Sequence, residues 1–386
     1  MSKWKKVRLG DLGNFRTGGT PSRSKPEFFQ GDIPWITTVA LGKKMIDESD
    51  AVEFISDEAL KKSSTKLIKP NSVMIGIRVG VGKTAINKVA MATNQDIISI
   101  EDIEESILHK PYLISFISSR SNLINSLKRG ATIQGISSSV LKDLLIPLPP
   151  LDIQKQIAHE LDTVSELLAL RKQQLEELDQ LIKSVFYEMF GDPVTNERGW
   201  EVKPFDQIGT LNSGGTPPRS NSSFFNGDIN WFSAGELNSR YLHESKEKIT
   251  ISALSSSSAK LFDENSMLIG MYDTAAFKLG ILTSKSSSNQ ACANIAVNKN
   301  LVNIEWLYDC CKLMRDFFLS NRRGVRQKNL TLGMIRSFEI PVPPLPIQDK
   351  FADIVTQIES QKALIKKAIN ETQLLFDSLM SKYFDD

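Results

Sequence analysis

The chain of 386 residues lacks the patterns on which membrane proteins and disulfide-stabilised proteins depend. Its three cysteines, Cys292, Cys310 and Cys311, show no CxxC spacing, which argues against a structural zinc site or a disulfide framework. No apolar run approaches the ~18 residues that a membrane span needs. The first residues are mixed and charged and do not resemble a signal peptide. We therefore expect a cytoplasmic protein.

Catalytic motifs are also scarce. The three histidines are scattered, and neither an Asn-Pro-Pro-Tyr-like motif nor a recurring carboxylate cluster is present. The stretch Gly80-Val81-Gly82-Lys83-Thr84 resembles a phosphate-binding loop, but Ile77 occupies the place of the required first glycine. A tight turn, or a loop that brings Lys83 near a DNA phosphate, is the preferred interpretation. The sequence predicts neither a nucleotide site nor a catalytic site.

What the chain does contain is a long internal repeat. Gly18-Gly19-Thr20-Pro21 is matched by Gly214-Gly215-Thr216-Pro217, at an offset of 196 residues. The same offset relates Gly31-Asp32-Ile33-Pro34-Trp35 to Gly227-Asp228-Ile229-Asn230-Trp231. Each copy closes on a proline-rich border, 146–151 or 340–345. The repeat predicts two similar modules that bind two versions of one kind of target.

Each border is followed by a helical pattern. In the first, from Ile157 to Met189, apolar residues alternate in steps of four and three and only Arg171 interrupts them. In the second, from Phe351 to Tyr383, Lys362 and Thr372 interrupt. Such a repeat is typical of a coiled coil. The alternative is two amphipathic helices packed on their own domains. The polar positions either fix the register or extend their charged ends to solvent.

These patterns predict a mixed α/β (α+β) fold with a pseudo-two-fold axis. Apolar runs at 72–77 and 266–271 indicate strands, separated by turns rich in glycine and serine. Two similar globular domains, at 1–150 and 192–344, alternate with helices at 151–191 and 345–386. The first helix, roughly 55 Å long, leads from one domain to the other. The second must run back antiparallel to bury its apolar seam.

Charge is divided unevenly along the chain. Residues 1–150 hold 21 Lys and Arg against 15 Asp and Glu, a net charge of +6, and residues 191–344 hold 17 against 15, or +2. The two helical segments are acidic, at −4 and −2. A polyanion would therefore be attracted to the globular domains, although ordinary scatter of surface charge would also give this distribution.

Candidate DNA-binding residues lie in three places in each copy: the Gly-Gly-Thr-Pro loop, the stretch after the predicted strand (78–83 or 272–278), and a basic loop. The Gly-Gly-Thr-Pro loops offer hydroxyls, free amides and a matched arginine, which suit phosphates or base edges; structural turns are the alternative. Basic loops precede the borders, and a purely solvated role for them stays open. The predicted set is Thr20, Arg23, Arg78, Lys83, Lys128, Arg129, Gln134, Thr216, Arg219, Tyr272, Lys278, Arg322, Arg323, Arg326, Gln327 and Lys328. Gln134 and Gln327 are the possible base readers.

In this order and repeated twice, these motifs resemble the specificity subunit of type I restriction–modification enzymes. The openings Leu9-Gly10-Asp11-Leu12-Gly13 and Phe205-Asp206-Gln207-Ile208-Gly209 and the Ile-Pro-x-Pro-Pro-Leu-x-x-Gln borders complete the resemblance, which covers nearly the whole chain. It implies two target-recognition domains, each reading half of a bipartite, asymmetric DNA site, and two spacer helices that set the gap.

The resemblance also implies a chain that is not an enzyme. Two methyltransferase subunits would dock on the spacer and methylate adenine, and restriction/translocase subunits would cleave unmodified DNA. S-adenosylmethionine, ATP and Mg would then bind to those partners and not to this chain. Two other functions stay open: a coiled-coil scaffold whose end domains bind protein, and a self-contained DNA-modifying enzyme.

Overall fold

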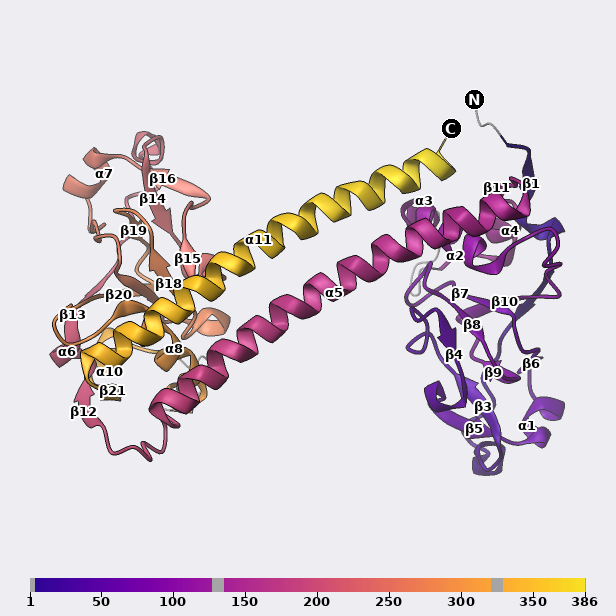
Figure 1. Ribbon diagram of the computed structural model, residues 1–386, viewed down its shortest axis with the longest axis horizontal. Coiled ribbons are helices and arrows are strands. Elements are labelled where there is room, and N and C mark those ends of the chain that lie inside the picture. The colour runs from indigo at the N-terminus through magenta and orange to yellow at the C-terminus, as the bar shows by residue number, and fades with distance from the viewer. Residues whose placement is uncertain (1–3, 127–134, 321–328, 386) are drawn as a thin grey trace. The chain divides into compact units, whose positions relative to one another are not determined.

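The computed structural model describes residues 4–126, 135–320 and 329–385 (Figure 1). The chain divides into two compact units, residues 1–172 with 367–386 (unit 1) and residues 173–366 (unit 2). Each unit therefore combines a globular part with the first half of one long helix and the second half of the other. The long helices are α5 (Leu151–Phe190) and α11 (Leu345–Phe384).

Short strands and helices make up the globular part of unit 1. Its helices are α1 (Asp57–Lys62), α2 (Lys110–Ser119), α3 (Ser121–Ser126) and α4 (Ser138–Lys142), with single 3-10 turns at Leu9–Asp11, Pro26–Phe29 and Glu48–Asp50. Its strands are β1 (Lys6–Arg8), β2 (Asn14–Thr17), β3 (Ile33–Ile36), β4 (Met45–Ile46), β5 (Glu53–Ile55), β6 (Leu67–Ile68), β7 (Val73–Gly76), β8 (Thr84–Asn87), β9 (Met91–Thr93), β10 (Ile97–Glu101) and β11 (Leu145–Pro147).

Unit 2 repeats this inventory with small changes. Its short helices are α6 (Phe205–Ile208), α7 (Ile251–Ser255), α8 (Ile304–Leu313), α9 (Arg315–Ser320) and α10 (Leu332–Arg336), with 3-10 turns at Ser222–Phe225, Ala234–Glu236 and Asp273–Ala275. Its strands are β12 (Glu201–Pro204), β13 (Gly209–Ser213), β14 (Ile229–Phe232), β15 (Tyr241–Leu242), β16 (Glu247–Ile249), β17 (Met267–Gly270), β18 (Leu279–Leu282), β19 (Ser287–Ser288), β20 (Cys292–Val297) and β21 (Glu339–Val342).

The two units share one sheet topology. The main sheet has the order β2-β10-β7-β8-β4 in unit 1 and β13-β20-β17-β18-β15 in unit 2. A second sheet is built around β3 or β14, and a two-stranded ribbon, β1-β11 or β12-β21, joins the start of each module to its proline border. The mixed α+β class, the tandem repeat and the strands expected at 72–77 and 266–271 are confirmed. Among the described residues, none of the helices has the length and apolar content of a membrane span.

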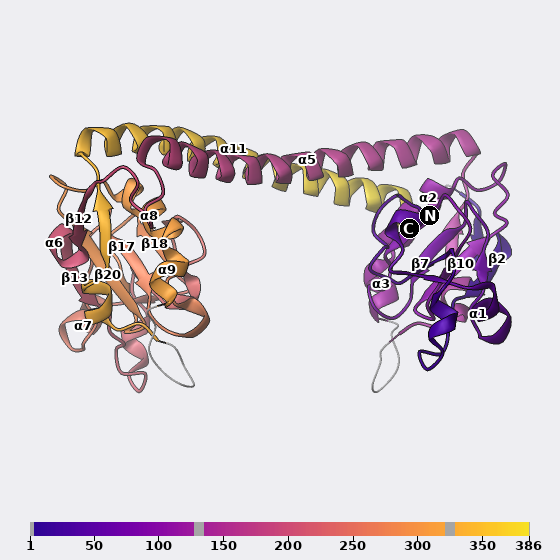
Figure 2. The same cartoon turned by 90° about the horizontal axis from the view of Figure 1, so that it is seen from below.

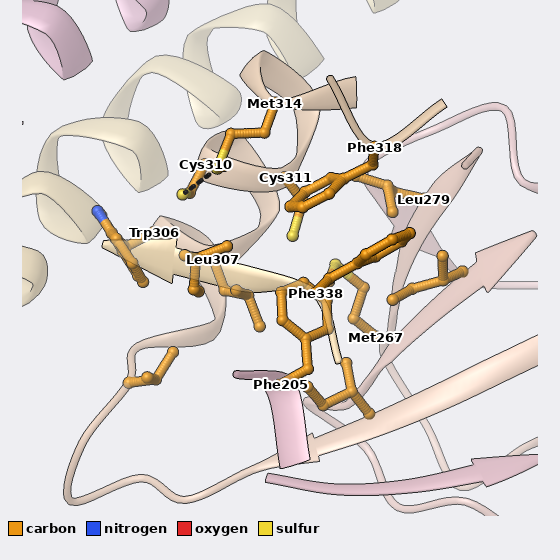
Figure 3. Packing of buried hydrophobic residues seen from close by; sticks show 14 of the residues in the cluster. Phe205, Met267, Leu279, Trp306, Leu307, Cys310, Cys311, Met314, Phe318 and Phe338 are labelled. Carbon is orange, nitrogen blue, oxygen red and sulfur yellow. Dashed lines mark hydrogen bonds between the residues drawn. The ribbon is translucent and has the colours of Figure 1, made fainter. Parts of the chain in front are cut away.

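The core of unit 2 gathers aromatic and sulfur-containing side chains between its main sheet and its helices. Phe318 and Phe338 stack with ring centroids 4.5 Å apart, and Phe205 packs edge-on against both. Cys310 Sγ lies 3.8 Å from Met314 Sδ (Figure 3). These side chains are buried, so the cysteines of this region serve as core residues. Burial also raises the pKa of the Cys292 thiol to about 12, which keeps it protonated near neutral pH.

A buried glutamine fixes the beginning of each long helix. Gln154 Oε1 accepts the backbone N–H of His109, and its Nε2 donates to the carbonyls of Ile107 and Pro149, each at 2.9 Å. Gln348 makes the same three bonds to Asn303, Leu301 and Pro343. Both side chains are fully buried. The repeated Ile-Gln pair thus ties the helix start to the globular part.

Within each unit the two long helices pack antiparallel along one side of the globular part (Figure 2). In unit 1 the Tyr383 hydroxyl donates to Glu160, and Arg171 Nη1 donates to the Ala368 carbonyl at 2.5 Å. In unit 2, Phe186 meets Phe351 with centroids 5.5 Å apart. The residue numbers rise along α5 as they fall along α11, which is the expected antiparallel arrangement.

The polar residues of the apolar seam bond across it. Arg171 also donates to the Thr372 hydroxyl, and Lys362 Nζ donates to Asp179 at 2.9 Å. Within α11, Lys362 also donates to Glu359 at 2.6 Å. Lys362 and Thr372 are buried. Of the two expected roles, fixing the register therefore describes them better than extension to solvent, because one slip of register would leave these groups unpaired.

Both interpretations of the helical pattern hold, each for a different part of the helices. Near their ends, Ile157, Leu161 and Phe384 belong to the core of unit 1, and Phe186, Phe190 and Phe351 belong to the core of unit 2. Nearer the middle, within unit 1, Arg171 of α5 bonds to Ala368 and Thr372 of α11. Gly191, in a left-handed conformation at φ 75°, ends α5.

Candidate nucleic-acid interface

The Gly-Gly-Thr-Pro loop and the Gly-Asp-Ile-x-Trp motif form one structural element. Trp35 Nε1 donates to the Gly19 carbonyl at 3.1 Å, and Trp231 Nε1 donates to the Gly215 carbonyl at 3.0 Å. A Cβ on Gly18 would approach the Asn94 carbonyl to 2.2 Å, and one on Gly214 would approach the Asn289 carbonyl to 2.3 Å. These glycines are required because the loop lies directly against the neighbouring backbone.

The hydroxyl predicted to contact DNA in each loop already has a protein partner. Thr20 Oγ1 donates to Gln95 Oε1, and Thr216 Oγ1 donates to Gln290 Oε1. Each glutamine keeps its amide N–H groups for another acceptor. The orientation of both amides is thereby fixed, and an oriented amide is the group that reads adenine in the major groove.

The two loop arginines are held by carboxylates. Arg23 donates through both terminal nitrogens to Glu53, at 2.6 Å each, and Arg219 donates to Glu247 at 2.5 and 2.8 Å. Each guanidinium also lies over a phenylalanine ring, Phe29 or Phe225, at 4.4 Å from its centroid. The arrangement supports the structural-turn interpretation, since the guanidinium N–H groups that would bind a phosphate already donate to a carboxylate. DNA contact by Arg23 and Arg219 stays a prediction.

The base of each basic loop lies beside the end of the central strand. The backbone N–H of Ile136 bonds to the Ile77 carbonyl at 2.9 Å, and that of Ile77 bonds to the Asp96 carbonyl at 2.8 Å. In unit 2 the Leu330 N–H bonds to the Met271 carbonyl and the Met271 N–H bonds to the Ala291 carbonyl, both at 2.8 Å. The fold therefore brings together the glutamine, the end of the strand and the end of the basic loop, which lie far apart in the sequence.

Arg78 and Tyr272 occupy equivalent places on this edge. Arg78 donates to Asp96 at 3.3 Å, and a Cβ on Gly135 would lie 2.6 Å from Arg78 Cγ. Tyr272 is exposed and follows Met271, the counterpart of Ile77. We use the name recognition edge for Thr20, Gln95 and Arg78 in unit 1 and for Thr216, Gln290 and Tyr272 in unit 2.

Lys83 and Lys278 are placed differently. Gly80 and Gly82, both with positive φ, turn the chain from β7 into the antiparallel strand β8, so Lys83 lies in a hairpin and not before a helix as in a phosphate-binding loop. The lysine lines a cavity with residues of α2, α5 and α11. Lys278 Nζ donates to Asn238 Oδ1 at 2.7 Å. Among the residues that the structure describes, neither of these arrangements involves the recognition edge.

Half of the predicted site residues lie outside the described part of the chain. They are Lys128, Arg129, Gln134, Arg322, Arg323, Arg326, Gln327 and Lys328. Their roles stay predictions.

Gln95 and Gln290 were absent from the sequence-based set. A signal was present, because Thr93-Asn94-Gln95 and Ser288-Asn289-Gln290 recur at an offset of 195 residues. The short match carries no recognisable chemistry until the fold places it against Thr20 and Thr216. In the described ranges no cluster of three or more His, Cys, Asp or Glu side chains could hold a metal ion.

The structure defines a class of protein: a tandem pair of equivalent α+β modules, each presenting a polar recognition edge beside the base of a basic loop. The family can then be stated. Residues 1–180 and 197–373 match the type I restriction modification DNA specificity domain, and the chain belongs to that family.

Similar proteins match either nearly the whole chain or a part of it. The MjaIX specificity subunit of Methanocaldococcus jannaschii is 25% identical, over 98% of this chain and 92% of its own. The EcoR124I/EcoR124II specificity subunit of Escherichia coli is 37% identical over 43% of this chain and 41% of its own. The type I S subunit from M. genitalium has a similar fold, with a TM-score of 0.61 at 15% identity, covering 100% of this chain and 96% of that one.

Proposed function

We propose that this chain is the specificity subunit of a type I restriction–modification complex and reads a bipartite, asymmetric DNA site. The observation that carries the proposal is the pair of recognition edges: one backbone arrangement is used twice, with Arg78 in one unit and Tyr272 in the other. Because the backbone arrangement is the same, both units can approach the DNA duplex in the same way. Because the side chains on the two recognition edges differ, the two half sites should have different base sequences.

Under this proposal each globular part is a target-recognition domain, residues 1–150 and 192–344, and residues 151–191 and 345–386 form the spacer. The shared Thr–Gln pair would contact what the half sites have in common. The basic loops, with Arg129 and Arg326, would supply phosphate and base contacts that differ between them.

The chemistry is assigned to partner subunits. Adenine methylation with S-adenosylmethionine and cleavage with ATP and Mg belong, in this proposal, to methyltransferase and restriction/translocase subunits, so this chain is not itself an enzyme. Because its DNA target is chromosomal or invading DNA, the proposal places it in the cytoplasm.

A repeated apolar surface on the long helices fits a partner that binds twice. Four leucines on one flank of the apolar seam are exposed, each two residues after or one residue before a seam position: Leu170 at 62%, Leu181 at 47%, Leu364 at 70% and Leu375 at 50%. Leu170 corresponds to Leu364 and Leu181 to Leu375, at the offset of 194 that separates the helices. The flank on the other side of the seam is buried within each unit, for example at Ala158 and Phe186. Exposed leucines in matched pairs suit two copies of one partner.

Charged substitutions test this partner surface. Leu170→Glu with Leu375→Glu changes unit 1, and Leu364→Glu with Leu181→Glu changes unit 2. Each double variant should lose one of two methyltransferase subunits in native mass spectrometry. Full binding of both subunits by both variants would exclude the leucines as the docking surface.

The function itself is tested by co-expression with the methyltransferase encoded beside this chain, followed by genome-wide mapping of methylated adenine. A single bipartite motif is expected, and exchange of residues 1–150 for another module should change one half of it. A change in both halves would contradict the two-reader arrangement. Methylation by the purified chain alone would instead favour the self-contained enzyme. DNA binding that depends on neither sequence nor salt would favour the alternative of a coiled-coil scaffold whose end domains bind protein.

A further inference from the structure

Unit 1 contains an open cavity of about 410 Å³ where α2, α5, α11 and the β7–β8 hairpin meet. Its lining includes Lys44, Lys83, Ser118, Ser121 and Ser165. Val81, Ile114, Leu161, Phe376 and Met380 supply an apolar part of the wall. Ammonium and hydroxyl groups, together with the Asp162 carboxylate that pairs with Lys44, thus surround a space large enough for a small organic anion.

The internal repeat shows which residues of unit 2 stand at the same places. The Ile86 N–H bonds to the Lys44 carbonyl as the Ile281 N–H bonds to the Arg240 carbonyl, so Lys44 and Arg240 are equivalent. The Gly76 N–H bonds to the Lys83 carbonyl as the Gly270 N–H bonds to the Lys278 carbonyl. Helices α2 and α8, like α5 and α11, correspond at an offset of 194.

In unit 2 the protein itself supplies acceptors for these cations. Arg240 donates to both oxygens of Asp309 at 2.7 Å and to Glu305 at 3.0 Å, and Glu359 lies 3.4 Å from its Nε. Lys278 Nζ donates to Asn238. Arg240 is thus neutralised within the protein, and Lys278 has an amide oxygen as a partner.

In unit 1 each of these acceptors is replaced. Ser115 stands for Asp309, Pro111 for Glu305, Ser165 for Glu359 and Gly42 for Asn238. Lys44 finds other partners, Asp162 at 3.2 Å and Glu166 at 3.1 Å. The stem of Lys83 lies over Gly80 and Gly42, and among the residues that the structure describes its ammonium has no recorded acceptor. Ser115 donates to the Pro111 carbonyl at 3.2 Å, whereas the hydroxyls of Ser118, Ser121 and Ser165 make no such bond within the described ranges.

We propose that this cavity binds a phosphate group in the place that carboxylates fill in unit 2. Lys83 is its principal cation, and the hydroxyls of Ser118, Ser121 and Ser165 are the donors that surround it. A phosphate oxygen accepts from ammonium and hydroxyl groups alike, and its charge complements that of Lys83. The phosphate comes either from a free mononucleotide, whose base would cover Phe376 and Met380, or from the DNA backbone. Only the second source rests on the proposed function.

The full chain is titrated with inorganic phosphate and with AMP by isothermal calorimetry, at constant ionic strength. Lys83→Ala should weaken binding about tenfold or more. Ser115→Asp, which installs the carboxylate of unit 2, should abolish it. Lys278→Ala, the matched change in unit 2, should leave it unchanged. Thermal melting of each variant checks that folding is intact, and Lys83→Gln provides a second neutral variant.

Duplex DNA forms the second arm. If the backbone is the source, AMP does not saturate the chain, but Lys83→Ala and Ser115→Asp both weaken duplex binding and lower the salt dependence by about one counterion. AMP binding lost in both variants establishes the free ligand. Unchanged AMP and DNA binding in folded Lys83→Ala, Lys83→Gln and Ser115→Asp overturns the site. Methylation mapping judges the DNA-reading function separately, because the two-part motif does not require this cavity.

Discussion

Units 1 and 2 attach their globular parts to the long helices from the same position of the fold but with different electrostatics. Lys44 makes an open ion pair with α5, and its side chain is 54% exposed. Arg240 is 6% exposed, is surrounded by three carboxylates and lies over the Tyr308 ring at 4.3 Å. The two modules therefore share a backbone frame, while the cation at this position has different acceptors in each.

The largest effect that we expect from the difference between Lys44 and Arg240 is on stability. Arg240→Met leaves the buried Asp309 without its cation and removes a partner of Glu305, whereas Glu359 keeps Lys362. It should lower the free energy of unfolding by about 3–5 kcal/mol. The matched Lys44→Met removes a solvent-exposed pair and should cost at most about 1 kcal/mol. Hydrogen exchange of α8 and α2 peptides measures the two units separately. Equal losses of unfolding free energy in Arg240→Met and Lys44→Met would contradict the proposed difference between the two ion pairs.

The buried glutamines test what the units share. Gln154→Leu and Gln348→Leu each leave one N–H and two carbonyls unpaired at the start of a long helix, at a cost of about 2–3 kcal/mol. Urea denaturation should give similar losses for the two variants. Gln156→Leu, an exposed control that pairs with Glu160, should have little effect. A loss confined to one unit would show that the helix starts are not equivalent.

The recognition edges test where the units differ in function. Arg78→Tyr should alter preference in one half site and Tyr272→Arg in the other, by about 1–3 kcal/mol of discrimination between bases. The untouched half site is the internal control in a competition binding assay. Altered preference in both half sites from one substitution would contradict independent reading.

The smallest expected difference is in pH dependence. Burial raises the pKa of Glu305, so the folded state binds its proton more tightly than the unfolded state. The contribution of this group to stability therefore falls as pH rises from the ordinary value of 4.5 through the raised pKa. Hydrogen bonds from Lys110 and Asn71 lower the pKa of Glu105 in unit 1, and its contribution is lost as pH falls. Hydrogen exchange of each unit against pH checks the opposite signs, and Glu305→Gln should reduce the response of unit 2, where burial also raises the pKa of Asp309.

Sequence patterns predicted much of the fold because they are local or periodic. The 3.5-residue apolar spacing, the proline borders and the repeated glycine loops each constrain a few consecutive residues, so they are visible in one chain. The interruption of the seam at Arg171 and Lys362 was visible too, and the structure shows those side chains bonded across the helix pair.

The candidate site was less predictable because its contacts join distant segments. Glu53 and Glu247, which hold Arg23 and Arg219, are 30 and 28 residues away from them. Gln95 is 75 residues from Thr20. A sequence shows that such side chains exist but not which of them meet, so an arginine that looked free for a phosphate turned out to be paired.

By itself the sequence determined the tandem repeat, the long helices and the family resemblance, since these follow from spacing and composition. Only the tertiary structure decided which polar groups are satisfied: it buried Arg240 among carboxylates, left Lys83 beside an open cavity and set Gln95 and Gln290 against their threonines. The physical reason is that burial and hydrogen bonding depend on three-dimensional proximity, and one frame can bring unlike side chains to the same place.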